Sequence, residues 1–442
     1  MSVTTAFNSA TFKVFAIGFL ALLMLIPLAQ VNDLVYERSQ RADTATATIA
    51  SRWGGEQILG GPVLVVPVRQ RVLRGNKVEV IVVYETILPD RLMIGGPLLP
   101  ELRRYGIYDT PVYTAKLQLE GAFIGADLLA IGCSDCEPLW ELAELRLPVS
   151  DVRGIREVGD LWFGDKEYRF GPGSGGFAGI AAVSTALPMA APSDGLTLPF
   201  SMEITLAGTR SLSLLPTARQ TTANLSATWP DPGFDGAFLP VTRKVGEQGF
   251  SAEWKVLDFN RRIPQHWREG NDESLQLASS GFGVSLLQPA ATYQQNTRAG
   301  KYGLLFIGLT FVAFFLFEVL RRWRVHPVQY LLVGFALCLF YVVLLALSEQ
   351  IGFAIAYACA AAVVVAMVGG YAITITRSRR AGASLGAALA MVYGLLYALI
   401  VSEDYALLTG SIGLVVVLGV VMYLTRRIDW YNLQTAGIPA NQ

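Results

Sequence analysis

Two cysteines three positions apart, Cys133 and Cys136, form a C-x-x-C pair that suits either a small structural disulfide or a redox centre. A thioredoxin-like redox centre needs its first cysteine at the N-terminus of a helix within a βαβ unit. The surrounding sequence, GCSDCEPLW, lies among strand patterns, and its acidic residues disfavour a thiolate. We therefore expect a structural disulfide. A zinc site would need a second pair nearby, and the other two cysteines, Cys338 and Cys359, lie in apolar runs.

Catalytic motifs are scarce. The chain has two histidines, His266 and His326, so that a triad or a histidine–metal centre outside the apolar runs would depend on His266 alone. The sequence has no H-E-x-x-H or P-loop motif. Carboxylates are numerous enough to form a general acid/base pair, but no spacing singles one out. We therefore expect no enzyme activity, no cofactor and no metal.

One carboxylate lies inside an apolar run. Glu318 occurs in FFLFEVLRRW, and an acidic residue in hydrocarbon is by default a functional hypothesis. Arg321 and Arg322 follow it by three and four positions, which allows the charge to be paired at the membrane interface. We therefore expect Glu318 to have a structural role, as the partner of Arg321 or Arg322 in an ion pair.

The elements that must position these residues begin with six apolar runs, each close to the about 20 residues that a helix needs to cross a bilayer. They span Phe12–Val31, Tyr302–Leu320, Tyr330–Leu347, Ile351–Ile375, Ala383–Val401 and Ala406–Leu424. The first is expected to be an uncleaved anchor, because cleavage after Ala29 would place Pro27 at a small-residue position. The predicted fold is a membrane α-helical bundle of six transmembrane helices with a large β-rich extracytoplasmic domain inserted between helices 1 and 2.

The domain boundaries follow from these runs. Residues 1–31 are the anchor, 32–301 the periplasmic β-rich domain, and 302–442 a five-helix bundle with a cytoplasmic C-terminus. Both termini are expected in the cytoplasm, because all nine basic residues outside the middle region then fall on the cytoplasmic side. Those residues are Lys13, Arg321, Arg322, Arg324, Arg377, Arg379, Arg380, Arg426 and Arg427.

The middle region alternates polar and apolar residues with the period of a strand. Pro62–Arg69 and Lys77–Leu88 flank a predicted hairpin turn at residues 74–76. Further strands are expected at Thr114–Ala122, Leu198–Ala207, Ser211–Leu215, Asn224–Trp229, Phe250–Val256 and Gly283–Leu287. The stretches FGPGSGGFAG (170–179) and WPDPGFDG (229–236) are expected to be breaks, and no long helix is expected. We predict one or two antiparallel sheets.

Composition agrees with a membrane protein. Among 442 residues, 52% are hydrophobic and 16% charged, and the formal net charge is zero. Residues 32–301 hold 26 basic and 30 acidic side chains, a net of −4, and the remainder holds nine and five, a net of +4. This balance gives no support for a nucleic-acid partner.

Residues 324–353, RVHPVQYLLVGFALCLFYVVLLALSEQIGF, resemble a signature of the CreD family of bacterial inner-membrane proteins. Further similar stretches, in the same order, are GPVLVVPV (61–68), DVRGI (151–155), TWPDP (228–232), TRAGKYGL (297–304), TFVAFFLFE (310–318) and RIDWY (427–431). The C-x-x-C pair is outside this pattern. Polar positions within the resemblance are candidates for shared structural or functional use: Glu318, His326, Gln329, Tyr330, Glu349, Arg427, Asp429 and Trp430.

The resemblance implies an inner-membrane protein linked to cell-envelope integrity, to tolerance of envelope-directed toxins and to stress responses, with no established catalytic residues. We expect a non-enzymatic protein that acts through binding by its β-domain. Its partners would be the lipid bilayer and another envelope protein, a lipid or a cell-wall polymer, with a homo-oligomer also open. The alternatives are a transporter or lipid-handling protein using Glu318 and Glu349, and a carboxylate-based enzyme acting on the cell wall.

Overall fold

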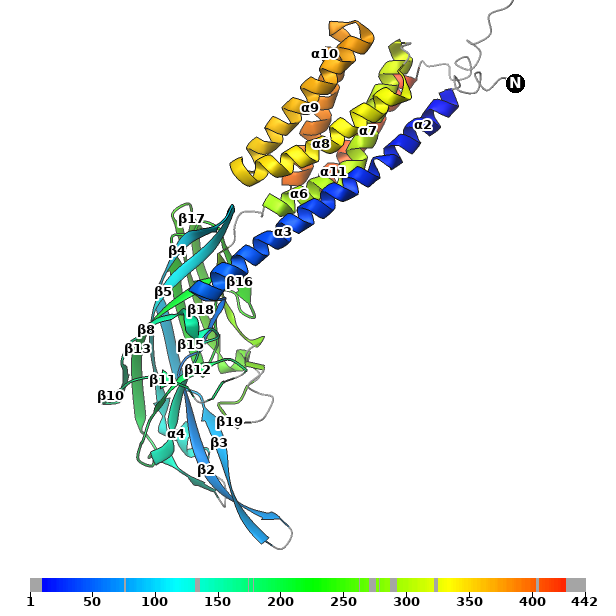
Figure 1. Cartoon of the computed structure of the whole chain (residues 1–442). Coiled ribbons are helices and arrows are strands. Elements are labelled where there is room, and N and C mark those ends of the chain that lie inside the picture. Colours follow the sequence, from blue (N-terminus) through cyan, green and yellow to red (C-terminus); the bar gives the residue numbers. More distant parts are fainter. Residues whose placement is uncertain are drawn as a thin grey trace, which may run out of the picture. The chain divides into compact units, whose positions relative to one another are not determined.

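The computed structural model describes residues 10–74, 77–131, 136–173, 175–177, 179–261, 263–269, 276–277, 279–286, 292–321, 325–402 and 405–426 (Figure 1). The chain divides into two compact units. The helical unit comprises residues 1–42 and 290–442, and the β unit comprises residues 43–289.

Most of the helices that contribute to the helical unit are strongly apolar, and α3 (Leu25–Trp53) and α6 (Thr292–Lys301) are more polar. In chain order they are α2 (Ala10–Leu23), α3 (Leu25–Trp53), α6 (Thr292–Lys301), α7 (Gly303–Arg321), α8 (Pro327–Ile351), α9 (Phe353–Thr376), α10 (Arg379–Val401) and α11 (Ala406–Thr425). Within the described residues, five helices are long and apolar enough to cross a membrane. The number becomes six if α6 and α7, which meet at a bend of 48°, form one span.

Two helical segments occupy sequence that was predicted to be β-rich. Helix α3 continues to Trp53, and α6 covers Thr292–Lys301, so the expectation of no long helix between residues 32 and 301 is wrong. Beyond Val31 the apolar residues thin out, but Val31, Val35, Ala45 and Ile49 are buried at helical spacing. An apolar run therefore marks the part of a helix suited to hydrocarbon and does not mark the end of the helix.

Glycines allow helices α9 and α10 to approach closely. Gly369 of α9 lies against Gly382 and Gly386 of α10, so the small-xxx-small pattern is used within one chain. A Cβ added at Gly382 would lie 2.9 Å from the carbonyl oxygen of Gly369 and closer still to Ile373. Helix α11 has no buried residue among those described, which suits contact with lipid around an apolar helix.

The described strands of the β unit form three sheets, and not the one or two expected. The nine-stranded sheet runs β10 (Lys166–Tyr168), β9 (Leu161–Phe163), β13 (Thr197–Thr209), β5 (Tyr108–Ile124), β4 (Arg91–Tyr105), β15 (Gln220–Ala227), β18 (Gly249–Leu257), β17 (Thr242–Gly246), with β8 (Ile155–Val158) beside β13. The seven-stranded sheet runs β11 (Gly171–Pro172), β12 (Ala182–Ala186), β7 (Glu144–Pro148), β2 (Val63–Arg74), β3 (Lys77–Ile87), β19 (His266–Arg268), with β6 (Cys136–Pro138) beside β2.

The four-stranded sheet runs β1 (Gln57–Leu59), β14 (Ser211–Leu214), β20 (Phe282–Leu286), β16 (Pro232–Gly236). The short helices of the β unit are α4 (Gly125–Leu129), η1 (Trp140–Leu142), η2 (Val152–Gly154) and η3 (Asp258–Asn260). Two pairs, β1 with β14 and β4 with β15, are parallel, which corrects the expectation of purely antiparallel sheets. Strands β11 and β16 lie in the two stretches expected to be breaks, because a glycine- or proline-rich segment can still pair at a sheet edge.

The alternation predicted from the sequence is present where two sheets pack. Along β18, Phe250, Ala252, Trp254 and Val256 are buried and their neighbours are not. The ring of Trp254 lies 5.9 Å from that of Phe282 on β20, so the nine-stranded and four-stranded sheets share a core.

Candidate functional site

Glu318 and Tyr330 meet in the interior of the helical unit. The Tyr330 hydroxyl donates to Glu318 Oε2 over 2.9 Å, and the backbone N–H of Val325 donates to Oε1 over 3.3 Å. Both side chains are buried, at 4% and 3% exposure, and the rings of Phe311 and Phe314 pack edge-on against Tyr330. The expected pairing with Arg321 and Arg322 involves side chains outside those the structure describes. The carboxylate thus joins the end of α7 to the start of α8.

His326 and Gln329 form the N-terminal cap of α8. The Val328 N–H donates to His326 Nδ1 over 3.3 Å, and the His326 N–H donates to Gln329 Oε1 over 2.9 Å. Pro327 occupies the first helical position, where its missing N–H costs nothing. This reciprocal arrangement is a capping box. His326 and Gln329 therefore stabilise the start of α8, and His326 does not act as a base in a cavity.

Glu349 belongs to a second polar cluster at the other end of α8. The Tyr293 hydroxyl donates to Glu349 Oε1 over 2.8 Å, and Asn296 Nδ2 donates to the Ser348 hydroxyl over 2.9 Å. Position 349 lies 22 residues after Pro327, which is about 33 Å along a helix. The structure therefore does not bring Glu318 and Glu349 together.

The structure describes only some of the remaining predicted site residues. Arg427, Asp429, Trp430 and Cys133 lie outside the described residues. Cys136 is disulfide-bonded, whereas Cys338 and Cys359 are free. The pairing of Cys133 with Cys136 stays a prediction. Within the described ranges no group of three His, Cys, Asp or Glu side chains is placed to hold a metal.

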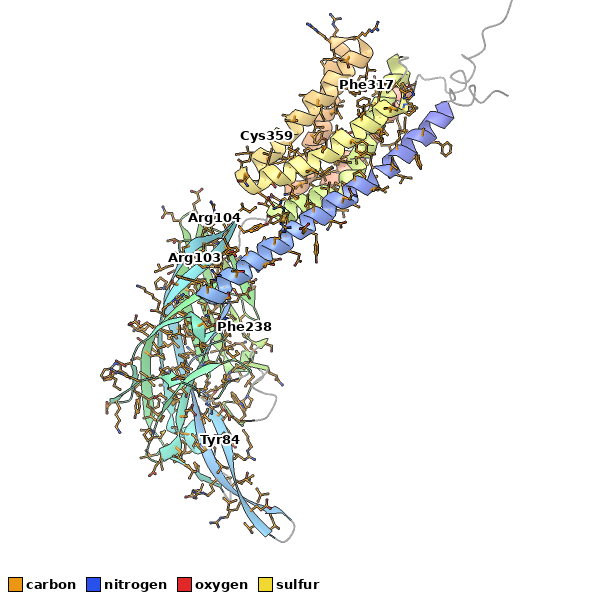
Figure 2. All side chains as sticks on the ribbon, viewed as in Figure 1. Tyr84, Arg103, Arg104, Phe238, Phe317 and Cys359 are labelled. Atoms are coloured by element: carbon orange, nitrogen blue, oxygen red, sulfur yellow. The ribbon has the colours of Figure 1, made fainter. Side chains whose placement is uncertain are left out.

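The sequence interpretation missed an exposed apolar surface on the hairpin of β2 and β3. The two strands pair throughout, from Leu64 with Ile87 to Arg74 with Lys77, and extend beyond the other strands of the β unit (Figure 1). The register places a set of side chains on one face, which we call the hairpin face: Arg69, Arg71, Leu73, Val78, Val80, Val82 and Tyr84. Its apolar members are 45% to 72% exposed; Tyr84 is labelled in Figure 2.

The same hairpin has an edge that pairs with the described strands over only part of its length. Strand β19 pairs with β3 only at Glu85–Ile87, so in the described part of the chain no strand pairs with the outer edge of β3 from Lys77 to Val83. On the other side, β6 covers β2 only at Val68–Gln70, where Glu137 forms an ion pair of 2.7 Å with Arg69. The sequence signal was present in the run Val80–Tyr84, which is apolar at every position and cannot have one apolar and one polar face.

A second surface is a groove of about 760 Å³ on the outer face of the nine-stranded sheet. We call it the sheet groove. Strands β4, β5, β9, β13 and β15 contribute most of its lining, which mixes apolar side chains such as Met93 and Trp162 with polar ones such as Ser201. Glu120 is the one carboxylate among the lining residues.

Two ionic junctions hold the loops of the β unit in place. Arg219 contacts Asp90 over 3.0 Å and Asp127 over 2.6 Å, and these hydrogen bonds, chiefly that of Asp127, raise the pKa of Arg219. Asp151 accepts from the N–H of Gly55 over 2.9 Å and from Arg153 Nε over 2.8 Å. The Arg153 guanidinium, aided by the backbone N–H groups of Gly55 and Arg153, holds the pKa of Asp151 below its usual range.

Comparison with known proteins decides the family. The profile of the CreD family, described as Inner membrane protein CreD, matches residues 9–431. The chain belongs to the CreD family. Inner membrane protein CreD of Escherichia coli (strain K12) is 33% identical over 432 residues, which cover 95% of this chain and 94% of that protein. Membership of the CreD family makes this chain an inner-membrane protein of the cell envelope, with several apolar helices and a β-rich region.

Likeness to solved structures is weak. A mutant M1 zinc metallopeptidase from Deinococcus radiodurans gives a TM-score of 0.23 at 12% identity, covering 45% of this chain and 42% of that chain. Another structure of the same enzyme gives 0.23 at 9% identity, covering 79% and 92%. Scores this low carry no conclusion about fold or activity.

Several stretches that resemble the CreD family have a packing role. A side chain at Gly300 would collide with Asn32, and a Cβ at Gly303 would lie 2.7 Å from Leu28. A Cβ at Gly334 would likewise lie 2.7 Å from the sulfur of Met24. In the helical unit of this CreD family member, glycines thus let α6, α7 and α8 pack against the N-terminal helices.

Proposed function

We propose that this chain supports the integrity of the cell envelope, and tolerance to envelope stress and envelope-directed toxins, by binding another envelope component through its β unit. The helices anchor it in the inner membrane, with both termini in the cytoplasm and the β unit in the periplasm. The distribution of basic residues supports this orientation, since all nine outside residues 32–301 then face the cytoplasm.

The observation that carries the proposal is the hairpin face. Soluble proteins rarely expose a contiguous row of apolar side chains, and such a row beside polar residues is typical of an interaction site. The outer edge of β3, with which no described strand pairs from Lys77 to Val83, can take up an extended segment of a partner. Apolar contact would supply affinity, and the edge would supply register.

The helical unit offers less for a transport function. Glu318, on α7 beside the start of α8, lies far from Glu349, which is near the end of α8. Each accepts a hydrogen bond from a tyrosine, so both have a structural use. An enzyme of the cell wall is also less well supported, because glycoside hydrolysis uses a pair of carboxylates and Glu120 alone lines the sheet groove.

The test is survival under envelope stress of cells in which a variant replaces the native chain. Val82→Glu puts a charge on the hairpin face and is expected to abolish the growth advantage in bile salts or a β-lactam. Val245→Glu on β17 is the matched control, because both valines are 51% exposed on strands. Equal protection by both variants, at equal protein levels in the membrane, would refute the proposal.

A further inference from the structure

The sheet groove carries an exposed aromatic side chain at the end of a row that is partly polar. Trp162 of β9 is 53% exposed, although a tryptophan of this kind usually buries most of its ring. The register places Trp162 beside Ser201 of β13, Ser201 beside Glu120 of β5, and Glu120 beside Met93 of β4. Met93 is in turn paired with Thr222 of β15, so one row of side chains crosses five strands.

This row has the length of an extended ligand. Four spacings between strands of about 4.8 Å give about 19 Å across the groove. A second row of side chains, next to this one on the same sheet, contains Ala122 between Pro199 and Arg91. Because the alanine side chain is small, the floor of the sheet groove is hollow at this position. A chain that lies perpendicular to the strands would contact both rows.

The chemistry of the lining selects the class of ligand. Trp162 offers a flat apolar face and Met93 a flexible apolar side chain. Ser201, Thr222 and Gln220 offer hydroxyl and amide groups that both donate and accept hydrogen bonds. Arg91 and Glu120 add one charge of each sign, so the groove carries no net charge. Sugar rings match this pattern, because each has apolar C–H faces and a rim of hydroxyl groups.

We propose that the sheet groove binds a neutral oligosaccharide, with Trp162 stacked on a sugar ring and the polar rows bonded to its hydroxyl groups. This inference goes beyond the proposed function, because it concerns a surface separate in sequence from the hairpin face. The Val82→Glu variant should therefore leave sugar binding unchanged, and the two proposals can fail independently.

The test is titration calorimetry on the full chain in lipid nanodiscs, which avoids detergents with sugar headgroups. The probes are hexamers of N-acetylglucosamine and of glucose. We expect at least one to bind with an affinity that is insensitive to salt between 50 and 300 mM, since a neutral ligand is not screened. Trp162→Ala should weaken binding about threefold to tenfold, and Trp162→Phe should weaken it less.

The matched control is Phe259→Ala, which removes an exposed aromatic side chain of η3 outside the groove and should leave the affinity unchanged. The unfolding temperatures of all variants are measured alongside. Binding of neither hexamer to the folded native chain would overturn the proposal. Equal affinity of the native chain and Trp162→Ala, or affinity that collapses with salt, would also overturn it.

Discussion

The hydroxyl group of Tyr330 lies 2.9 Å from Glu318 Oε2 and donates a hydrogen bond to it across the corner between α7 and α8. Both side chains are buried in an apolar bundle, where an unpaired carboxylate is costly. The pair therefore gives Glu318 a structural role, and it explains why an acidic residue is tolerated in the run FFLFEVL.

Removing the Tyr330 hydroxyl tests this role. We expect Tyr330→Phe to lower the free energy of unfolding by about 1–3 kcal/mol, because it leaves a buried acceptor with one partner fewer. The measurement is the unfolding temperature of the detergent-solubilised chain. Tyr423→Phe, at an exposed tyrosine of α11, is the control and should have no effect. An unchanged unfolding temperature in Tyr330→Phe would contradict the structural role.

The variant Glu318→Gln distinguishes a structural role of Glu318 from a role of its charge in transport. Glutamine keeps an oxygen that can accept from Tyr330, so we expect a small loss of stability and full protection against envelope stress. The readouts are the unfolding temperature and survival in bile salts. Loss of protection with an unchanged unfolding temperature would show that the charge itself is needed, and would favour a transport function.

Close packing of α9 and α10 predicts a large effect at Gly382. We expect Gly382→Ala to destabilise the helical unit by about 1–3 kcal/mol, because the added methyl group meets backbone atoms that cannot rotate away. Gly394→Ala in the same helix is the matched control, since nothing lies within 4 Å of its added Cβ. The control should be neutral or slightly stabilising. Equal yields and unfolding temperatures for the two variants would contradict the close packing of α9 against α10.

The Asp151 junction predicts a dependence of stability on pH. Since the pKa of Asp151 is lowered in the folded chain, its contribution is present above the ordinary carboxyl pKa of about 3.9 and is lost as the pH falls through the folded value. Asp151→Asn should therefore be less stable than the native chain at pH 6, and the difference should shrink below about pH 4. Asp165→Asn, in an exposed turn, is the control.

Urea unfolding followed by tryptophan fluorescence measures this difference, because six of the eight tryptophans lie within residues 43–289. A gap between Asp151→Asn and the native chain that stays constant from pH 6 to pH 3 would contradict the assigned cause.

Local pattern was enough to predict much of the fold. The β2–β3 hairpin forms at the predicted place because two runs rich in valine flank a short polar stretch, and the buried face of β18 follows from its period of two. The continuation of α3 to Trp53 was missed, since its polar half lacks an apolar run. Strand β16 was missed because its pairing with β20 is made across 50 residues of sequence.

The candidate site was harder to predict. Polar positions such as His326 and Gln329 could be selected from the sequence, but their use as a helix cap depends on where α8 begins. Val80 and Val82 were expected to be ordinary strand residues with one buried face. Their exposure arises because the hairpin extends beyond its neighbouring strands, which local sequence does not encode.

Binding through the hairpin face can be tested by site-specific photo-crosslinking in living cells, with a benzophenone amino acid at position 82 on the hairpin face or at position 245 on β17. We expect a discrete crosslinked product from position 82 that increases under envelope stress, and none from position 245. The absence of a product at position 82, or identical products from both positions, would contradict binding through the hairpin face.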